Sequence, residues 1–371
     1  MVKIIVVGQT PPPYGGQALM IEYMLNANFE HIEFFHVRMN FSKEMDERGK
    51  FSFYKLNHII YLIKETYKLK FRHNIDILYY PLSNAPKISI YRDAFFLLFT
   101  RFLFKRVIFH FHAAGISEEL PKMNFLERLI LKSIFNKPDL TIALSEFNPR
   151  DGEYLNCKNN FIIPYGIPYT NLKNISAKAS SLLKTRPLKV LFVGLLNGTK
   201  GEGYLLDAIY ILNQQKYQIN LQLAGKFESE HYEKMFFKKV EEYNLQNNVE
   251  YLGVVVGESK HQAFLNADIF CFPSFFISES FGIVQLEAMQ YHLPIIATKW
   301  RGIQSIIEIG KNGFLVDIKN ARQLAEKIKF FLDNPEEIIT MGNYSRKLFD
   351  EKYTLEKWTK RLEDAFLSIS K

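Results

Sequence analysis

The sequence predicts an α/β protein with two doubly wound, Rossmann-like domains, each built around a parallel sheet. A chain of 371 residues is too long for one ordinary core and fits two domains of roughly 150–200 residues each. Short apolar strand segments alternate with amphipathic helical patterns, which is typical of βαβ units. This alternation occurs twice, and the largely polar segment Pro168–Pro187 separates the two series. We therefore expect one domain over residues 1–167 and a second over residues 168–354.

The first series begins at Ile4–Val7, a continuous apolar strand of the kind that is buried on both faces of a parallel sheet. Amphipathic helical patterns follow, for example at Tyr54–Lys70 and Phe125–Ile134. The other strands expected in this domain are Glu33–Val37, Ile75–Tyr79, Val107–His112, Leu140–Leu144 and Phe161–Ile163.

The second series begins at Lys189–Val193. Ligands of open α/β sheets bind outside the carboxyl ends of the strands, so we expect the functional residues on the loops that follow them, in a cleft between facing domains. The other strands expected in this domain are Ile219–Ala224, Val249–Leu252, Ile269–Phe272, Pro294–Ala297 and Gly313–Val316.

Composition narrows the class of protein. With 47% hydrophobic and 23% charged residues the chain is globular, and its two cysteines, Cys157 and Cys271, indicate neither a disulfide framework nor a zinc site. The first residues lack the pattern of a signal peptide, and no uncharged apolar run reaches the roughly 18–20 residues of a membrane span. We expect a cytoplasmic protein. Its net charge of +8 favours an anionic partner, either a nucleotide diphosphate or anionic lipid, whereas no nucleic-acid recognition motif is present.

The segment that follows strand Ile269–Phe272 predicts an anion site. A Ser-Phe-Gly turn leads into a helical pattern, so the backbone N–H groups at the helix start lack partners within the helix and face the positive end of its dipole. Glycine at this turn lets a ligand approach the backbone. The residues at this start are Phe281, Gly282 and Ile283.

Two carboxylates flank the same turn. Glu279 precedes it, and Glu287 follows after seven intervening residues, inside the helical pattern. Carboxylates that accept pairs of hydrogen bonds suit the vicinal hydroxyls of a sugar, so carboxylates beside an anion site fit a sugar joined to a phosphate. The alternative is an ordinary amphipathic helix with two solvated glutamates.

This segment resembles the E-x7-E signature of the family-4 retaining glycosyltransferases (glycosyl transferases group 1), which have the GT-B fold. The resemblance extends from about residue 4 to about residue 320. Further matching segments, in the same order along the chain, are Gly15-Gly16, His112, Ile163-Pro-Tyr-Gly166, Leu191-Phe-Val-Gly194, Lys200-Gly201, Leu223-Ala-Gly225, Tyr251-Leu-Gly253 and Asn312-Gly-Phe-Leu-Val316.

The resemblance implies a retaining, metal-independent transfer of a sugar from a nucleotide-sugar, with a UDP- or GDP-sugar as the expected donor and no cofactor. It also implies that the final helix, about residues 355–371, crosses back onto the first domain, which holds the acceptor side. The acceptor would be a glycan or a lipid-linked glycan, with bacterial surface-polysaccharide synthesis as the expected pathway. The chain has no Asp-x-Asp pair, which agrees with a metal-free reaction.

The resemblance also assigns residue roles. Glu279 would hold the donor sugar, Glu287 the ribose diol and Lys200 the diphosphate, and His112, favoured over His110, would contact the donor sugar. We expect Gly16 to contact a phosphate or the acceptor; the alternative is that it belongs to a plain connecting loop. The basic residue that the family has after its strand glycine is absent, because Leu195 stands there; Lys226 or a residue of the first domain could replace it.

Three features depart from the family or leave their role open. The bulky basic loop Lys299-Trp-Arg301 stands where the family has small residues, and it is either a contact for donor or acceptor or an exposed loop, as is Glu308 after it. Tyr165 replaces the usual Asn before Gly166. The basic pattern Lys55–His73 predicts an amphipathic helix that either lies on an anionic membrane surface, on the inner face of the cell membrane, or packs its apolar stripe on the core.

Two other classes of function remain open. One is a GT-B-fold enzyme of another kind, such as a nucleotide-sugar epimerase or hydrolase, or a phosphorylase, for which no cofactor lysine is evident. The other is a non-catalytic protein that binds a membrane surface. A dehydrogenase is excluded, because neither first turn carries the dinucleotide fingerprint G-x-G-x-x-G.

Overall fold

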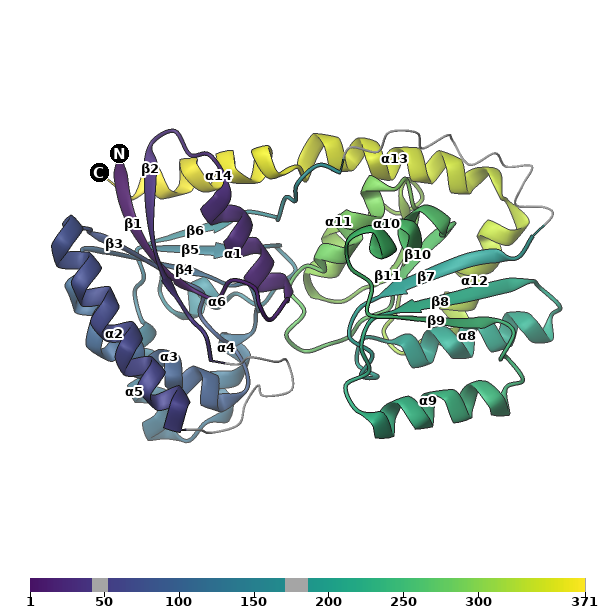
Figure 1. Cartoon of the computed structure of the whole chain (residues 1–371), viewed down its shortest axis with the longest axis horizontal. Coiled ribbons are helices and arrows are strands. Elements are labelled where there is room, and N and C mark those ends of the chain that lie inside the picture. Colours follow the sequence, from purple (N-terminus) through teal and green to yellow (C-terminus); the bar gives the residue numbers. More distant parts are fainter. Residues whose placement is uncertain (42–52, 171–185, 371) are drawn as a thin grey trace. The chain divides into compact units, whose positions relative to one another are not determined.

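The computed structural model describes residues 1–41, 53–170 and 186–370 (Figure 1). Contacts divide the chain into two units. The first consists of Met1–Pro168 together with Leu355–Lys371, and the second of Tyr169–Thr354. Each unit contains one six-stranded parallel sheet, so the prediction of an α/β fold with two doubly wound sheets is confirmed.

The first sheet has the order β2-β1-β3-β4-β5-β6. Strand β1 (Val2–Gly8), which lies between β2 and β3, is buried from Ile4 to Val7, as expected for a parallel strand covered by helices on both faces. The other strands are β2 (Ile32–Arg38), β3 (Ile77–Tyr80), β4 (Arg106–His110), β5 (Leu140–Ala143) and β6 (Asn159–Ile162).

The helices of the first unit include one that is remote in the sequence. This helix, α14 (Leu355–Ser368), packs Phe366 against Phe34 and Tyr79 of the sheet with ring centroids 6.2 and 6.0 Å apart. The others are α1 (Gly16–Asn26), α2 (Phe53–His73), α3 (Lys87–Thr100), η2 (Arg101–Leu103), α4 (Ile116–Glu119), η3 (Leu120–Lys122), α5 (Phe125–Phe135) and α6 (Asp151–Tyr154).

The second sheet has the order β12-β11-β10-β7-β8-β9, which is the strand order of a Rossmann fold. Its strands are β7 (Leu188–Val193), β8 (Ile219–Ala224), β9 (Val249–Gly253), β10 (Ile269–Phe272), β11 (Ile295–Thr298) and β12 (Gly313–Val316). Its helices are α8 (Glu202–Gln214), α9 (Glu230–Glu242), α10 (Gly257–Asn266), α11 (Ile283–Gln290), η4 (Arg301–Ile306), α12 (Ala321–Asp333) and α13 (Glu336–Lys352).

Two sequence-based expectations need refinement. Strand β4 ends at His110 rather than His112, because the chain turns there and the N–H of His112 donates to the carbonyl of His110 at 3.1 Å. Helix α2 directs Ile59 and Leu62 into the core of the first unit, so this part of its apolar stripe packs on the protein. No helix in the described ranges has both the length and the apolarity needed to cross a bilayer.

Candidate functional site

The topology of the second sheet brings two loops to one place. Strand order reverses between β7 and β10, which pair in parallel with Val190 opposite Ile269. The connections that leave these two strands run in opposite directions along the sheet, so their first loops meet outside the strand ends, where open α/β sheets bind ligands. One loop carries Lys200 and the other carries Glu279.

A glycine allows the two loops to approach closely. Gly201 has φ +87°, and a Cβ at this position would lie 2.1 Å from the carbonyl oxygen of Pro273. The N–H of Phe275 donates to the carbonyl of Thr199 at 2.9 Å, which joins the loops a second time. Only glycine adopts this positive φ and allows the two backbones to come this close without strain. This explains why a glycine follows Lys200.

The close approach places an ammonium against a carboxylate. Lys200 Nζ donates to Glu279 Oε2, and their side chains are only 16% and 12% exposed. The ammonium also lies 4.7 Å from the centre of the Phe276 ring, within the range of a cation–π contact. Removing either partner would leave a largely buried charge uncompensated, which is costly.

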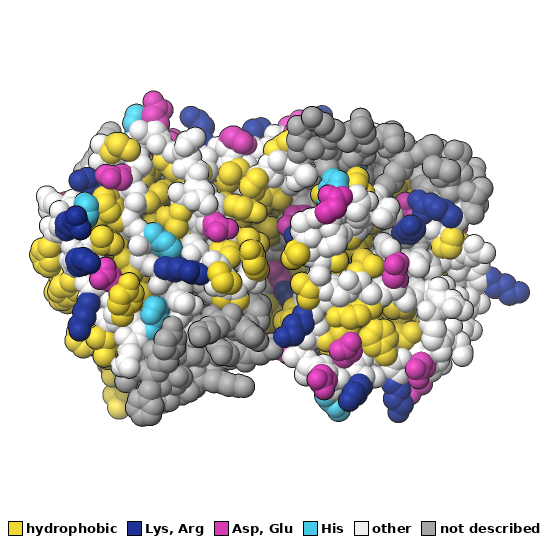
Figure 2. Space-filling view, viewed as in Figure 1, with side chains coloured by type: hydrophobic (Ala, Val, Ile, Leu, Met, Phe, Trp, Pro, Cys, Tyr) yellow, Lys and Arg dark blue, Asp and Glu magenta, His cyan; other side chains and the backbone are white. Residues whose placement is uncertain are grey.

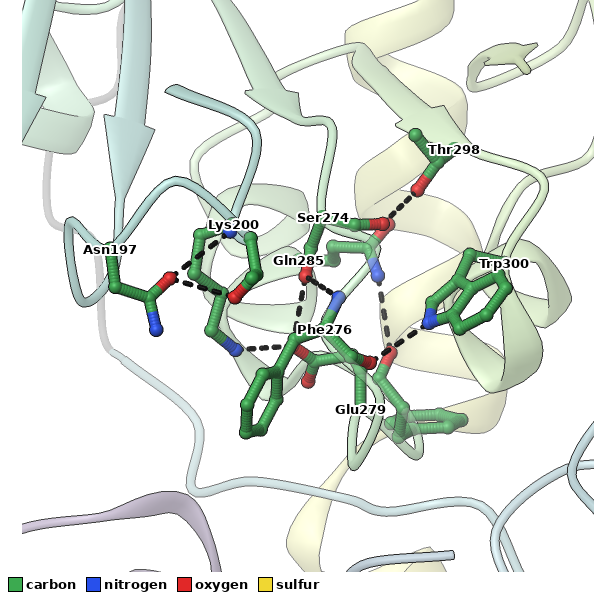
Figure 3. Close-up of polar contacts among 10 residues, drawn as sticks. Asn197, Lys200, Ser274, Phe276, Glu279, Gln285, Thr298 and Trp300 are labelled. Atoms are coloured by element: carbon green, nitrogen blue, oxygen red, sulfur yellow. Dashed lines mark hydrogen bonds and ion pairs between the residues drawn. The ribbon is translucent and has the colours of Figure 1, made fainter. Parts of the chain in front are cut away.

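The loop that carries Glu279 is fixed by neighbouring polar groups (Figure 3). Ser274 Oγ donates to Glu279 Oε2 at 3.3 Å and accepts from the N–H of Phe276, also at 3.3 Å. Thr298 Oγ1 donates to the carbonyl of Ser274, and Trp300 Nε1 donates to the carbonyl of Phe276 at 2.9 Å. The carboxylate is therefore held in a preformed position.

Helix α11 begins where the sequence predicted an anion site. Gly282 is its N-cap in the left-handed conformation, with φ 81°, and Ile283 is its first residue. A Cβ on Gly282 would lie 2.9 Å from the ring of Phe272, so a larger residue is excluded here. The side chain of Phe281 is buried in the core, with its ring 6.1 Å from that of Tyr353. Only the backbone of Phe281 is therefore suited to a ligand.

Glu287 has a partner that sequence reasoning missed. Lys260 of α10 donates to Glu287 Oε1 at 2.6 Å, and the two side chains are 32% and 22% exposed. The residues are 27 positions apart, and nothing in the local sequence of α10 marks Lys260 as special. The half-buried side chain of Trp300 was likewise predicted only as part of a bulky loop, whereas it fixes the backbone near Glu279.

In the first unit, His112 belongs to a buried polar network. Its Nε2 lies 2.9 Å from the hydroxyl of Tyr79 and its Nδ1 lies 2.5 Å from the hydroxyl of Tyr165. Tyr79 also reaches Nδ1 of His110 at 2.7 Å, so both histidines share one face, as strand spacing predicts. Burial lowers the pKa of His112 to about 3. Its imidazole is therefore neutral at physiological pH and can donate from only one nitrogen.

Gly16 is the first residue of α1 in the first unit, after the Gly15 N-cap. Its backbone is exposed at the loop that follows β1, the position expected for a ligand contact.

Thus Lys200, Glu279 and the start of α11 come together in the second unit, and Glu287 lies further along the same helix. Among the residues that the structure describes, no cluster of His, Cys, Asp or Glu could hold a metal ion.

Comparison with known proteins supports this picture. Residues 174–348 match the family model of glycosyl transferases group 1. An uncharacterized glycosyltransferase from Haemophilus influenzae is 29% identical over 201 residues, 54% of this chain and 53% of that protein. The D-inositol 3-phosphate glycosyltransferase of Pseudarthrobacter chlorophenolicus is 33% identical over 154 residues, 41% of this chain and 36% of that protein. The alignments thus span about half the length of these relatives or less.

Solved structures match over the whole chain. HepE from Anabaena, solved in complex with UDP, has 18% sequence identity and a TM-score of 0.70, covering 99% of this chain and 100% of that one. Sucrose-phosphate synthase from Thermosynechococcus elongatus has 18% identity and a TM-score of 0.73, covering 100% and 99%. The fold is that of the GT-B class of two-domain α/β proteins, as the motifs predicted. Within it, the second unit contains most of the segment that matches glycosyl transferases group 1.

Proposed function

We propose that this protein transfers a sugar from a nucleotide-sugar donor, a UDP- or GDP-sugar, to a hydroxyl group of a glycan or lipid-linked acceptor. The observation that carries the proposal is the placement of the Lys200 ammonium and the Glu279 carboxylate together, where two loops meet at the switch point of the second sheet. The match of residues 174–348 to glycosyl transferases group 1 supports it, as does the UDP bound to the structural neighbour HepE.

The residues have separate tasks in this reaction. The bond between the anomeric carbon and the diphosphate breaks, and Lys200 together with the backbone at Phe281–Ile283 stabilises the departing negative charge. Glu279 holds the hydroxyls of the transferred sugar, and Glu287 holds the ribose diol. In the first unit, His112 contacts the sugar as a neutral imidazole, and Gly16 contacts phosphate or acceptor.

The stereochemistry that we propose is retention. The acceptor oxygen attacks the face from which the diphosphate leaves, and a diphosphate oxygen takes the acceptor proton. No side chain is then needed as a general base, and no metal ion is needed if Lys200 and the helix start supply the positive charge. The expected setting is the synthesis of a bacterial surface polysaccharide.

Donor binding is the first test of the proposal. The melting temperature should be measured with UDP-, GDP-, ADP-, CMP- and dTDP-sugars for the parent and for Lys200→Ala, with the exposed Lys234→Ala as the matched control. A ligand at about a hundred times its Kd adds about 2.7 kcal/mol of stability. One class of nucleotide should stabilise the parent and the control but not Lys200→Ala.

A transfer assay then separates the alternatives. Release of nucleotide that depends on an added acceptor, with the anomeric configuration of the donor kept in the product, is the expected result. Release or isomerisation of the donor without acceptor would identify an epimerase or a hydrolase instead. Stabilisation by no nucleotide-sugar at all would overturn the proposal and favour a non-catalytic binding protein.

A further inference from the structure

We propose that the outer faces of α3 and α5 in the first unit dock on an anionic lipid bilayer. These faces, together with η2, form what we call the apolar face. It consists of Ile88, Tyr91, Phe95, Leu98, Phe99, Phe102, Phe125, Leu126, Leu129 and Ile130. The inference goes beyond sugar transfer and does not rest on it, because binding to vesicles is measured without donor or acceptor.

The apolar face is exposed to an unusual degree. Phe102, Phe125 and Leu126 are 70%, 67% and 67% exposed. Ten of the twenty-five large hydrophobic side chains that are exposed in the described part of the chain belong to this face. Large contiguous apolar surface on a protein marks an interaction site, whereas single exposed residues do not.

Helix geometry gathers these residues on one side of their helices. On α3 the core-facing positions Ile90, Ala94 and Leu97 are buried, and the exposed positions lie between them at spacings of three and four residues, which is one face of a helix. On α5 the same holds for the buried Leu131 and Phe135. Both helices therefore present a second apolar face, directed away from the sheet.

The two faces are neighbours. Helix α3 packs against α5 on one side and α2 on the other. The hydroxyl of Tyr91 on α3 donates to Glu127 Oε1 on α5 at 3.2 Å, and the hydroxyl of Tyr67 on α2 donates to the carbonyl of Phe99 on α3 at 2.9 Å. The three helices thus form one layer, to which α3 and α5 contribute the apolar face.

The positive charge of this helical layer favours an anionic partner. Residues 57–73, 87–105 and 125–135 carry ten Lys and Arg against three Asp and Glu. Asp76, just beyond α2, pairs with two of these lysines, Lys70 and Lys105, so the layer keeps an excess of positive charge. On the face of the molecule seen in Figure 2, Lys and Arg side chains lie among hydrophobic ones at the edge of the first unit where Figure 1 places α2.

A bilayer with anionic headgroups matches both properties. Aromatic and aliphatic side chains enter the boundary between headgroups and acyl chains, while lysine and arginine around them attract the negative surface. Helix α2 supplies cations such as Lys64, Lys68 and Arg72 from its exposed side. The surface that contacts the bilayer is thus formed by α3 and α5, with α2 beside them. It is not the apolar stripe of α2, because part of that stripe is buried.

Vesicle co-sedimentation of the full chain tests the inference. The probes are vesicles of phosphatidylcholine with about a third phosphatidylglycerol, and vesicles of phosphatidylcholine alone. Leu98→Glu is the test variant and Met235→Glu on α9 is the control, because both side chains are 55% exposed on helices and receive the same new charge. Melting curves of both variants verify that each is folded.

The expected result is binding to the anionic vesicles that weakens with added salt, and that Leu98→Glu reduces by about tenfold while Met235→Glu leaves it unchanged. Equal binding to both kinds of vesicle, or an equal effect of the two variants, would overturn the inference. The inference would also be overturned if the parent chain did not bind vesicles but formed an oligomer in sedimentation that Leu98→Glu disrupted, because a second copy of the chain would then cover the apolar face. Loss of donor binding in the thermal assay alone would count against sugar transfer and leave this result untouched.

Discussion

Gly201 lies so close to Pro273 that a Cβ on the glycine would come within 2.1 Å of the proline carbonyl oxygen. This contact joins the loop after β7 to the loop after β10, and it sets Lys200 against Glu279. The ion pair is therefore a consequence of backbone packing, and its geometry depends on a residue that has no side chain.

Replacement of Gly201 by alanine should separate the two loops. The methyl group meets the Pro273 carbonyl, and φ +87° is itself unfavourable for alanine. We expect a loss of stability of roughly 1–3 kcal/mol and a weaker affinity for the nucleotide-sugar, measured by melting and by titration. Gly203→Ala is the control, because only the Tyr232 hydroxyl lies near its Cβ, at 4.0 Å. Equal behaviour of the two variants would contradict the role of the loop contact.

Replacement of Lys260 by methionine should act through Glu287. The variant removes the 2.6 Å interaction but keeps the length of the side chain, so the carboxylate loses the group that orients it. We expect a KM for the donor raised by roughly three- to tenfold with kcat little changed, the pattern of lost uniform binding. Lys238→Met, which breaks the exposed pair with Glu242, should leave both constants as they are. A fall in kcat alone would show that Lys260 acts elsewhere.

Replacement of Trp300 by phenylalanine should loosen the loop that carries Glu279. The variant keeps an aromatic ring at this position but loses the N–H that donates to the Phe276 carbonyl. One hydrogen bond of this type contributes about 1 kcal/mol, which corresponds to a fall in Tm of roughly 2–4 °C for a unit of this size. An unchanged Tm together with unchanged donor affinity would mean that Trp300 does not fix the loop.

The first unit should lose stability on acidification through His112. Burial lowers the pKa of His112 in the folded chain to about 3, from an ordinary value of 6.5. Between these values the unfolded chain binds more protons, so the stability is fully present above about pH 6.5 and is lost as the pH falls towards 3. His110 shares the direction of this shift, because burial and the neighbouring His112 both lower its pKa.

The measurement is the Tm of the parent and of His112→Gln between about pH 7 and about pH 4. At the higher pH the variant should melt below the parent, because the hydroxyls of Tyr79 and Tyr165 lose their partner. The difference should shrink as the pH falls, since protonation removes the advantage of the parent. A constant difference between His112→Gln and the parent over this pH range would contradict the prediction.

Most of the fold could be predicted because its signals are local. Each buried strand is a short apolar run, and a parallel sheet with helices on both faces requires such runs. The end of β4 was placed too late, since the turn at His112 depends on a backbone hydrogen bond to His110 that no side chain announces. Tyr79 lies in a predicted strand, yet its contact with two histidines depends on the pairing of β3 with β4.

The candidate site could be predicted only where its residues share a motif. Glu279, Gly282 and Glu287 stand in one segment, and Lys200 stands in another whose glycine is conspicuous. Lys260 could not be predicted as the partner of Glu287, because their contact depends on the packing of α10 beside α11. The position of Trp300 was visible in the sequence, but its hydrogen bond to a carbonyl 24 residues away was not.

The order of the chain has a consequence for synthesis. The second unit is one continuous stretch, Tyr169–Thr354, whereas the first unit includes α14, which follows that whole stretch in the sequence. During translation, the second unit is therefore complete on the ribosome before the first has received Trp358 and Phe366, both fully buried in the finished structure. Until α14 emerges, the rings that these two side chains contact in the finished structure, Phe34, Tyr79 and Tyr165, lack that cover.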